Sequence, residues 1–194
     1  MSDPVRPGLR AALLLARGRT QELAPPGPVE ADIATARRSF ATAGFCLPAF
    51  IFLHLLDRLA AEVAGAEAAP EWTAADWRGL AVALLGFAIG WAGFALVSHR
   101  VALRLGRGAL WPRFIALWNW CNFVQYLLLL AAALIGLAPL PAIIGQTAWL
   151  VALGWAIWLE WFMTRFALAM PGLLAMAVVA LDLAIGMLVA GIVG

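Results

Sequence analysis

Long apolar runs separated by short polar or charged breaks dominate this chain. A helix needs about 20 mostly apolar residues to cross the hydrocarbon core of a bilayer. Five stretches meet that condition: residues 39–61, 79–98, 112–136, 141–163 and 168–193. The pattern therefore predicts an all-α membrane protein, built as a bundle of five transmembrane helices.

The breaks between these runs predict the loops. "DRLAAEVAGAEAAPEWTAADWRG" is polar and acidic, "HRVALRLGRGALWPR" is basic, and "LAPLP" is a tight proline turn. The composition agrees with a membrane protein, because 64% of the residues are apolar. Soluble chains contain about 45–50%.

The arginines set the expected orientation, because basic residues are enriched in cytoplasmic loops. All thirteen basic residues are Arg, and only Arg58 and Arg78 fall on the side opposite to the N-terminus. The others lie in the N-terminal segment and in the second and fourth loops: Arg6, Arg10, Arg17, Arg19, Arg37, Arg38, Arg100, Arg104, Arg107, Arg113 and Arg165. We therefore expect a cytoplasmic N-terminus and a periplasmic C-terminus. The lack of Lys, with 18 Gly and 11 Pro, is typical of a GC-rich bacterial genome and indicates the inner membrane.

Residues 1–38 are expected to form a cytoplasmic segment ahead of the membrane domain, 39–194. Within it, "GLRAALLLARGR" predicts a short amphipathic helix on the inner leaflet, with Arg10 and Arg17 reaching anionic lipid headgroups. A disordered basic tail is the alternative. The run "AALLLA" is too short for a signal peptide. The prolines of "APPGPVEAD" cannot continue a helix and predict a linker.

Polar residues interrupt the third run, "ALWNWCNFVQYLLLL", residues 116–130. At 100° per residue, Asn119, Asn122 and Tyr126 share one helix face, and Gln125 lies at its edge. This face is expected to point into the bundle. Trp120 lies on the opposite face and is expected to contact lipid or a neighbouring protein.

Polar groups of four runs reach a similar depth when about 1.5 Å is counted for each residue. The predicted intramembrane polar layer is His54, Asn119, Asn122, Gln125, Gln146 and Asp182. One interpretation is a small-substrate or proton site, with Asp182 as the titrating group. The other is a set of hydrogen bonds that fixes helix register, with a neutral Asp182 bound to Gln125.

Two further sets of residues predict contacts between helices. Glu160 lies close in depth to three basic side chains, which predicts an ion-pair cluster at the cytoplasmic helix ends rather than a substrate clamp: His99, Arg113, Glu160 and Arg165. Small residues at spacings of three and four allow close approach of two backbones. The predicted helix-packing residues are Gly86, Gly90, Gly93, Gly186 and Ala190.

Little in the sequence points to enzyme chemistry or a cofactor. The chain contains no GxGxxG, GxxxxGK[ST], GxSxG or HExxH motif. His54 with Asp57 offers too few ligands for a metal, and Cys46 and Cys121 lie in apolar runs. We expect no cofactor, no metal and no nucleic-acid partner. A lipid or quinone enzyme with Glu160 or Asp182 as acid or base ranks last, because no second carboxylate is expected beside either residue.

The leading functional hypothesis is a non-catalytic scaffold or accessory subunit that packs against another membrane protein or against itself. Trp91, Trp118 and Trp120 support it, because they lie too deep for an interfacial aromatic belt. The alternative is a small transporter or proton-coupled permease that uses the polar layer around His54 and Asp182.

Four segments also resemble a known family: "ALLLARGRTQEL…RRSFATAGFCLPAF", "GWAGFALV", "RFIALWNWCNFVQ" and "RFALAM…AVVALDLAIGML". They are similar to small alphaproteobacterial inner-membrane proteins grouped with the Yip1 superfamily. The resemblance implies five spans, a cytoplasmic N-terminus and a non-enzymatic role through protein partners.

Overall fold

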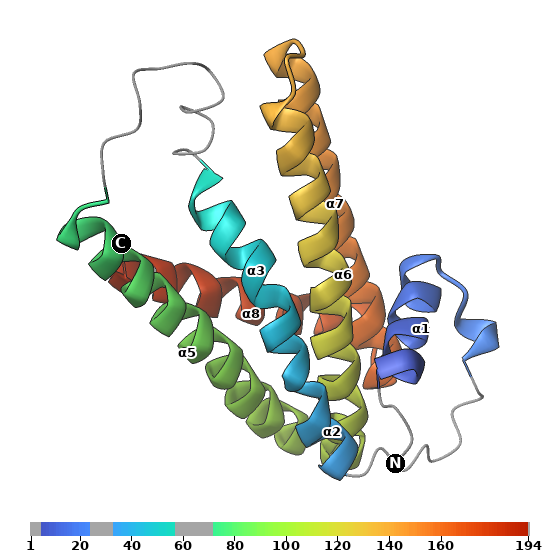
Figure 1. Cartoon of the computed structure of the whole chain (residues 1–194). Coiled ribbons are helices and arrows are strands. Elements are labelled where there is room, and N and C mark those ends of the chain that lie inside the picture. The colour runs from blue at the N-terminus through green and yellow to red at the C-terminus, as the bar shows by residue number, and fades with distance from the viewer. Residues whose placement is uncertain (1–4, 24–32, 57–71, 194) are drawn as a thin grey trace.

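The computed structural model describes residues 5–23, 33–56 and 72–193, and all the regular elements in these ranges are helices (Figure 1). The longer ones are α1 (Val5–Ala16), α2 (Ile33–Ser39), α3 (Ala41–His54), α5 (Ala74–Arg104), α6 (Trp111–Leu137), α7 (Ala142–Ala167) and α8 (Gly172–Val193). Two short 3-10 turns are η1 (Thr20–Glu22) and η2 (Gly108–Leu110). The expected proline linker and most of the acidic loop, including Asp57 and Arg58, lie outside the described residues.

Four helical segments are long and apolar enough to cross a membrane: Ala74–Arg104, Gly108–Leu137, Ala142–Ala167 and Gly172–Ile192. They match the last four predicted runs and give the chain the helices of a multi-pass membrane protein. The first predicted run begins as α3, which has 14 residues. The end of that run lies outside the described residues.

Local sequence signals explain where α5 and α6 begin and end. Thr73 and Asp76 form a capping box at the start of α5, which satisfies two backbone N–H groups at the helix end. This cap lets α5 start before residue 79, where the apolar run begins. Gly106 has a φ of 68°, a conformation that ends helices and favours glycine. Pro112 lies in the first turn of α6, where a missing N–H costs nothing.

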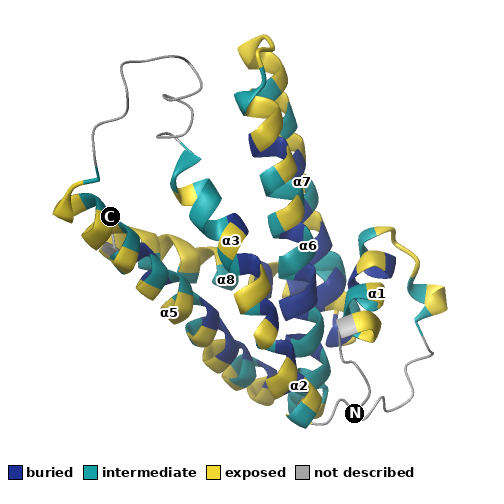
Figure 2. Cartoon of the chain, viewed as in Figure 1, coloured by how far each residue is buried: buried dark blue, intermediate teal, exposed yellow. Residues whose placement is uncertain are grey.

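The long helices diverge rather than forming a parallel bundle. Figure 1 shows α6 and α7 as an antiparallel hairpin, with α5 leaning away from it and α3 between the two arms. Helix α8 returns from the end of α7 and packs against α5. Buried residues gather along α6 and α7 beside α1, whereas exposed residues cover the far end of the hairpin (Figure 2). A second contact region lies where α3, α5, α6 and α8 approach one another.

The predicted N-terminal helix is present and packs against α6 and α7. Its Ala12 and Leu15 are fully buried, so its apolar face covers protein. Trp120 was expected to face lipid or a partner, and this prediction was wrong. Its side chain is buried next to Gly8 of α1 and Phe45 of α3. The docked N-terminal helix supplies a cover for this indole, and the apolar pattern of α6 alone does not reveal that cover.

Candidate functional site

Asn119 is fully buried and links three helices. Its Oδ1 accepts a hydrogen bond from Nε1 of Trp91 on α5 at 2.6 Å, and its Nδ2 donates to Oγ of Ser39 on α2 at 2.7 Å. Ser39 in turn donates to the carbonyl of Ala36. Both ends of the amide therefore have partners, as a buried polar group requires. Asn119 fixes the positions of α2 and α5 against α6.

Gln125 also connects helices, though not to the partner that the sequence suggested. Its Nε2 donates to the carbonyl oxygen of Ala156 on α7 at 2.7 Å, and not to Asp182. Gln146 is exposed on α7 and does not join the other polar residues, which contradicts its place in the predicted layer. The layer thus divides: Asn119 and Gln125 hold helices together, while His54, Asn122 and Asp182 face a common pocket.

That pocket has a volume of about 630 Å³ and lies between α3, α5, α6 and α8. Its size is typical of sites for small organic ligands, about 300–1,000 Å³. The described residues that line it are Phe50, His54, Gly79, Ala83, Gly86, Phe87, Gly90, Trp91, Trp118, Asn122, Tyr126, Asp182, Ile185, Gly186, Val189 and Ala190.

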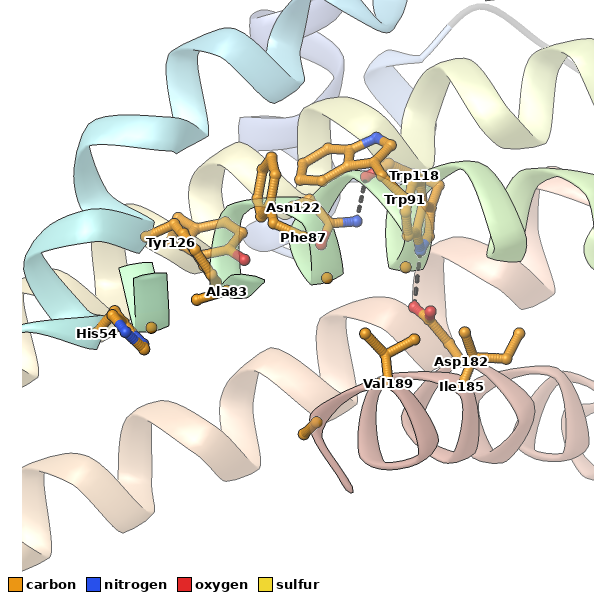
Figure 3. A pocket seen from close by; sticks show the side chains of 16 residues that line it. His54, Ala83, Phe87, Trp91, Trp118, Asn122, Tyr126, Asp182, Ile185 and Val189 are labelled. Carbon is orange, nitrogen blue, oxygen red and sulfur yellow. Dashed lines mark hydrogen bonds between the residues drawn. The ribbon is translucent and has the colours of Figure 1, made fainter. Parts of the chain in front are cut away.

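The polar groups of the pocket lie along its length (Figure 3). His54 is at one end and Asp182 at the other, with Tyr126 and Asn122 between them. Nε1 of Trp118 donates a hydrogen bond of 3.0 Å to Oδ2 of Asp182. Nδ2 of Asn122 donates to the backbone carbonyl of Trp118 at 3.0 Å. Asp182 is thereby held at the wall of the pocket by α6.

Four of the predicted helix-packing residues line this pocket, namely Gly86, Gly90, Gly186 and Ala190, and Gly93 is not among the described lining residues. Helices α5 and α8 do pack together, and a Cβ added at Gly93 would lie 3.9 Å from Ile185. A Cβ at Gly90 or Gly186 would meet no atom within 4 Å. Small residues on α5 and α8 therefore leave space between the two helices, in addition to allowing their approach.

Behind Asp182 lies a second carboxyl group, that of Glu160 on α7. The two carboxyl groups interact electrostatically across the contact between α7 and α8. Glu160 is only 7% exposed, and its Oε1 has no hydrogen-bond partner among the described residues. The expectation that no second carboxylate accompanies Asp182 was therefore wrong.

The predicted ion-pair cluster does not form among the described residues. His99 packs against the ring of Trp111, with the centroids 4.6 Å apart. The guanidinium of Arg113 lies 4.5 Å from the ring centroid of Phe166, and that of Arg165 lies 5.7 Å from Trp161. These basic side chains pack against aromatic rings, whereas Glu160 interacts with Asp182.

The position of the connection between α7 and α8 explains why the sequence did not predict this carboxyl pair. Helix α7 continues to Ala167 rather than ending at 163, and α8 begins at Gly172 rather than 168. At about 1.5 Å per residue, these shifts place Glu160 about 6 Å deeper and Asp182 about 6 Å shallower than expected. Two residues predicted at different depths therefore meet.

Two interacting carboxyl groups inside a membrane protein have defined chemistry. An ionised carboxylate only accepts hydrogen bonds, so the two groups attract each other only when one of them is protonated and donates a hydrogen bond to the other. Repulsion and poor solvation oppose ionisation of both. The Glu160–Asp182 pair can therefore hold and release a proton at the pocket wall. No group of three or more His, Cys, Asp or Glu that could bind a metal occurs within the described ranges.

Comparison of the chain with protein-family models, with curated proteins and with solved structures found no match. The resemblance to the Yip1 superfamily stays a prediction. Function is therefore inferred from the pocket and its carboxyl pair.

Proposed function

We propose that this protein is a small proton-coupled carrier that binds its substrate in the pocket between α3, α5, α6 and α8. The observation that supports it is the position of Asp182 on the wall of a ligand-sized pocket, where the buried Glu160 of α7 interacts with it electrostatically. If the two carboxyl groups only held α7 and α8 together, no ligand-sized pocket would be needed beside them. Intramembrane carboxyl groups are costly and commonly mark ion or proton pathways.

The arrangement provides a route for coupling. Asp182 can contact a ligand on the pocket side while sharing a proton with Glu160 on the other. A ligand that interacts with the ionised form of Asp182 changes how many protons the pair holds, and the converse effect on ligand affinity follows from linkage. Five spans are few for a transporter, so we propose that two copies of the chain form the complete carrier.

The role as an accessory subunit, which was the leading hypothesis from the sequence, loses one of its supports. Trp91, Trp118 and Trp120 are all buried within the chain, and the first two donate hydrogen bonds to Asn119 and Asp182. These side chains have internal partners and are not exposed anchors for another protein. A role through partner proteins stays a prediction.

For the topology, we propose five spans with the N-terminus in the bacterial cytoplasm and the C-terminus in the periplasm. The support is the distribution of Arg and the apolar run 39–61, whose first part is α3 packed against α6. Alkaline phosphatase, active only in the periplasm, and green fluorescent protein, fluorescent only in the cytoplasm, would each be fused to the C-terminus. With the N-terminus in the cytoplasm, five spans predict an active phosphatase and no fluorescence, whereas four spans predict the reverse.

The carrier function can be tested in liposomes that contain the purified protein and an entrapped pH indicator. A panel of small cationic, neutral and anionic compounds would be added, and proton movement would be followed. We expect at least one class to drive protons with the wild-type protein. Asp182→Asn should abolish this movement and Glu160→Gln should reduce it, because an amide cannot take up or release a proton and Asp182 is still present in the second variant.

A pocket-filling variant separates the pocket from the carboxyl pair. Gly186→Leu adds a side chain to the pocket wall, whereas Gly191→Leu adds one on the same helix at an open position outside the pocket. Gly186→Leu should block proton movement, and Gly191→Leu should not. If no class of compound moves protons through the wild-type protein, or if both leucine variants behave alike, the carrier proposal is wrong.

A further inference from the structure

The charges around the pocket favour a positively charged ligand. Asp182 is the acidic side chain among the described lining residues, and none of these residues is Arg. His54, the basic residue of the set, lies at the far end (Figure 3). A carboxyl group on an apolar wall without a neighbouring cation is a site where a ligand can supply that cation.

The wall of the pocket that α5 and α6 form is aromatic. Phe87 and Trp91 come from α5, and Trp118 and Tyr126 come from α6. The rings of Trp91 and Tyr126 are parallel to within 11°, with their centroids 6.4 Å apart. Aromatic faces attract cations that approach within about 6 Å, and this attraction is stronger where water is excluded.

The volume and the donor set favour an organic cation over a metal ion. A pocket of about 630 Å³ with mostly apolar walls matches a ligand of several rings or a branched hydrocarbon body. Calcium and magnesium require about six or more oxygen ligands. The lining side chains of the described residues that carry oxygen are those of Asp182, Asn122 and Tyr126, so a metal ion would have to keep most of its water ligands beside apolar walls.

We propose that the pocket binds a hydrophobic organic cation, whose charge lies against Asp182 and whose body lies between the aromatic wall of α5 and α6 and the aliphatic wall of α8. This inference rests on the proposed carrier function and names its class of substrate.

Binding of such a cation is expected to exchange with a proton. When the Glu160–Asp182 pair holds a proton, binding of a ligand of charge +1 can release that proton to water. The total charge of the site then stays unchanged. Proton and ligand therefore compete, and affinity should fall as the pH falls, by at most about tenfold per pH unit.

Other titratable groups near the pair are Cys121 and Tyr126 on α6. His54 on α3 faces the pocket from its other end, and α5 contributes no titratable group to the described lining. Protonation of His54 would oppose the cation in the same direction as protonation of the pair. The variant His54→Gln separates the two effects, because the pH dependence should persist in it.

The probe for this inference is tetraphenylphosphonium, and its control is tetraphenylborate, which has nearly the same shape and the opposite charge. Neither probe titrates, so any pH dependence comes from the protein. Binding would be measured by isothermal titration calorimetry to the full chain in phosphatidylcholine nanodiscs, with empty nanodiscs subtracted. Titration in buffers of different ionisation enthalpy reports the number of protons released.

We expect saturable binding of the phosphonium, release of a proton and weaker binding at low pH. Asp182→Asn should reduce the affinity by about tenfold to a hundredfold, because it removes a charged partner. Glu160→Gln should retain binding but release fewer protons, since Asp182 is still present to meet the ligand. Gly186→Leu should lose binding, and Gly191→Leu should retain it, which controls for misfolding.

The outcomes separate this inference from the carrier proposal. Equal saturable binding of both probes, or binding of the borate alone, would show that the pocket does not select cations. Binding of neither probe, together with proton movement driven by neutral or anionic compounds, would overturn the cation inference and leave the carrier function intact. If no compound binds and no proton moves, both are wrong.

Discussion

Nε1 of Trp118 on α6 lies 3.0 Å from Oδ2 of Asp182 on α8 and donates a hydrogen bond to it. The same carboxyl group lines the pocket and interacts electrostatically with Glu160 of α7. A neutral N–H donor can stabilise a carboxylate without cancelling its charge. An Arg side chain in the same place would cancel it. The indole thus keeps Asp182 in place and leaves it able to interact with a cation or a proton.

Trp118→Phe tests this relationship because it keeps the aromatic wall and removes the donor. We expect the affinity for tetraphenylphosphonium to fall by about threefold to tenfold, as for the loss of one hydrogen bond. The control is Trp149→Phe, which alters a partly exposed indole on α7 outside the pocket. Equal affinities for both variants and the wild type would mean that the indole N–H does not position Asp182.

Asn119→Ala should destabilise the fold more than Asn122→Ala. The first substitution leaves Trp91 and Ser39 without their partner in the interior, at a cost of about 1–3 kcal/mol for an unsatisfied group. The second removes a bond to a carbonyl of the same helix, four residues away. Thermal unfolding in detergent, followed by size-exclusion chromatography of the heated samples, would rank the two. A lower midpoint for Asn122→Ala would contradict the assignment of Asn119 as the interhelical link.

Gln125→Leu and Gln146→Leu form a second matched pair. Gln125 donates to Ala156 across the α6–α7 contact, and interhelical bonds of this kind contribute about 0.6–2 kcal/mol. Gln146 is exposed, so its replacement should change stability by less than about 0.5 kcal/mol. The same heating assay applies. If Gln146→Leu is the more damaging change, Gln146 has a contact that the structure of one chain does not contain.

The sequence was sufficient to predict the long helices, because an apolar run of this length in a membrane can satisfy its backbone hydrogen bonds in few ways other than a helix. It also predicted that Asn119 and Gln125 face the interior, since the helical period fixes which residues share a face. It could not pair them: their partners, Ser39 and the Ala156 carbonyl, depend on how α2 and α7 are placed in space.

The sequence failed to predict the Glu160–Asp182 pair for a more local reason. The sequence around 164–171 is apolar enough to belong to either helix, so hydropathy places the turn only to within a few residues. An error of that size changes the inferred depth of Glu160 relative to Asp182 by more than the length of a side chain. Trp120 shows the converse problem, because its burial depends on a segment more than a hundred positions earlier in the chain.

Gly8→Ala should loosen the N-terminal helix. A methyl group at this position would overlap the indole of Trp120, which also packs against Phe45 and Phe123 and has little room to move. Gly44→Ala on α3 is the matched control, because its Cβ would meet no atom within 4 Å. Alanine is the better helix former by about 1 kcal/mol, so without this overlap both changes should stabilise their helices. We expect faster hydrogen exchange of α1 amides in Gly8→Ala alone. Unchanged or slower exchange there would show that α1 does not dock on Trp120 through its glycine.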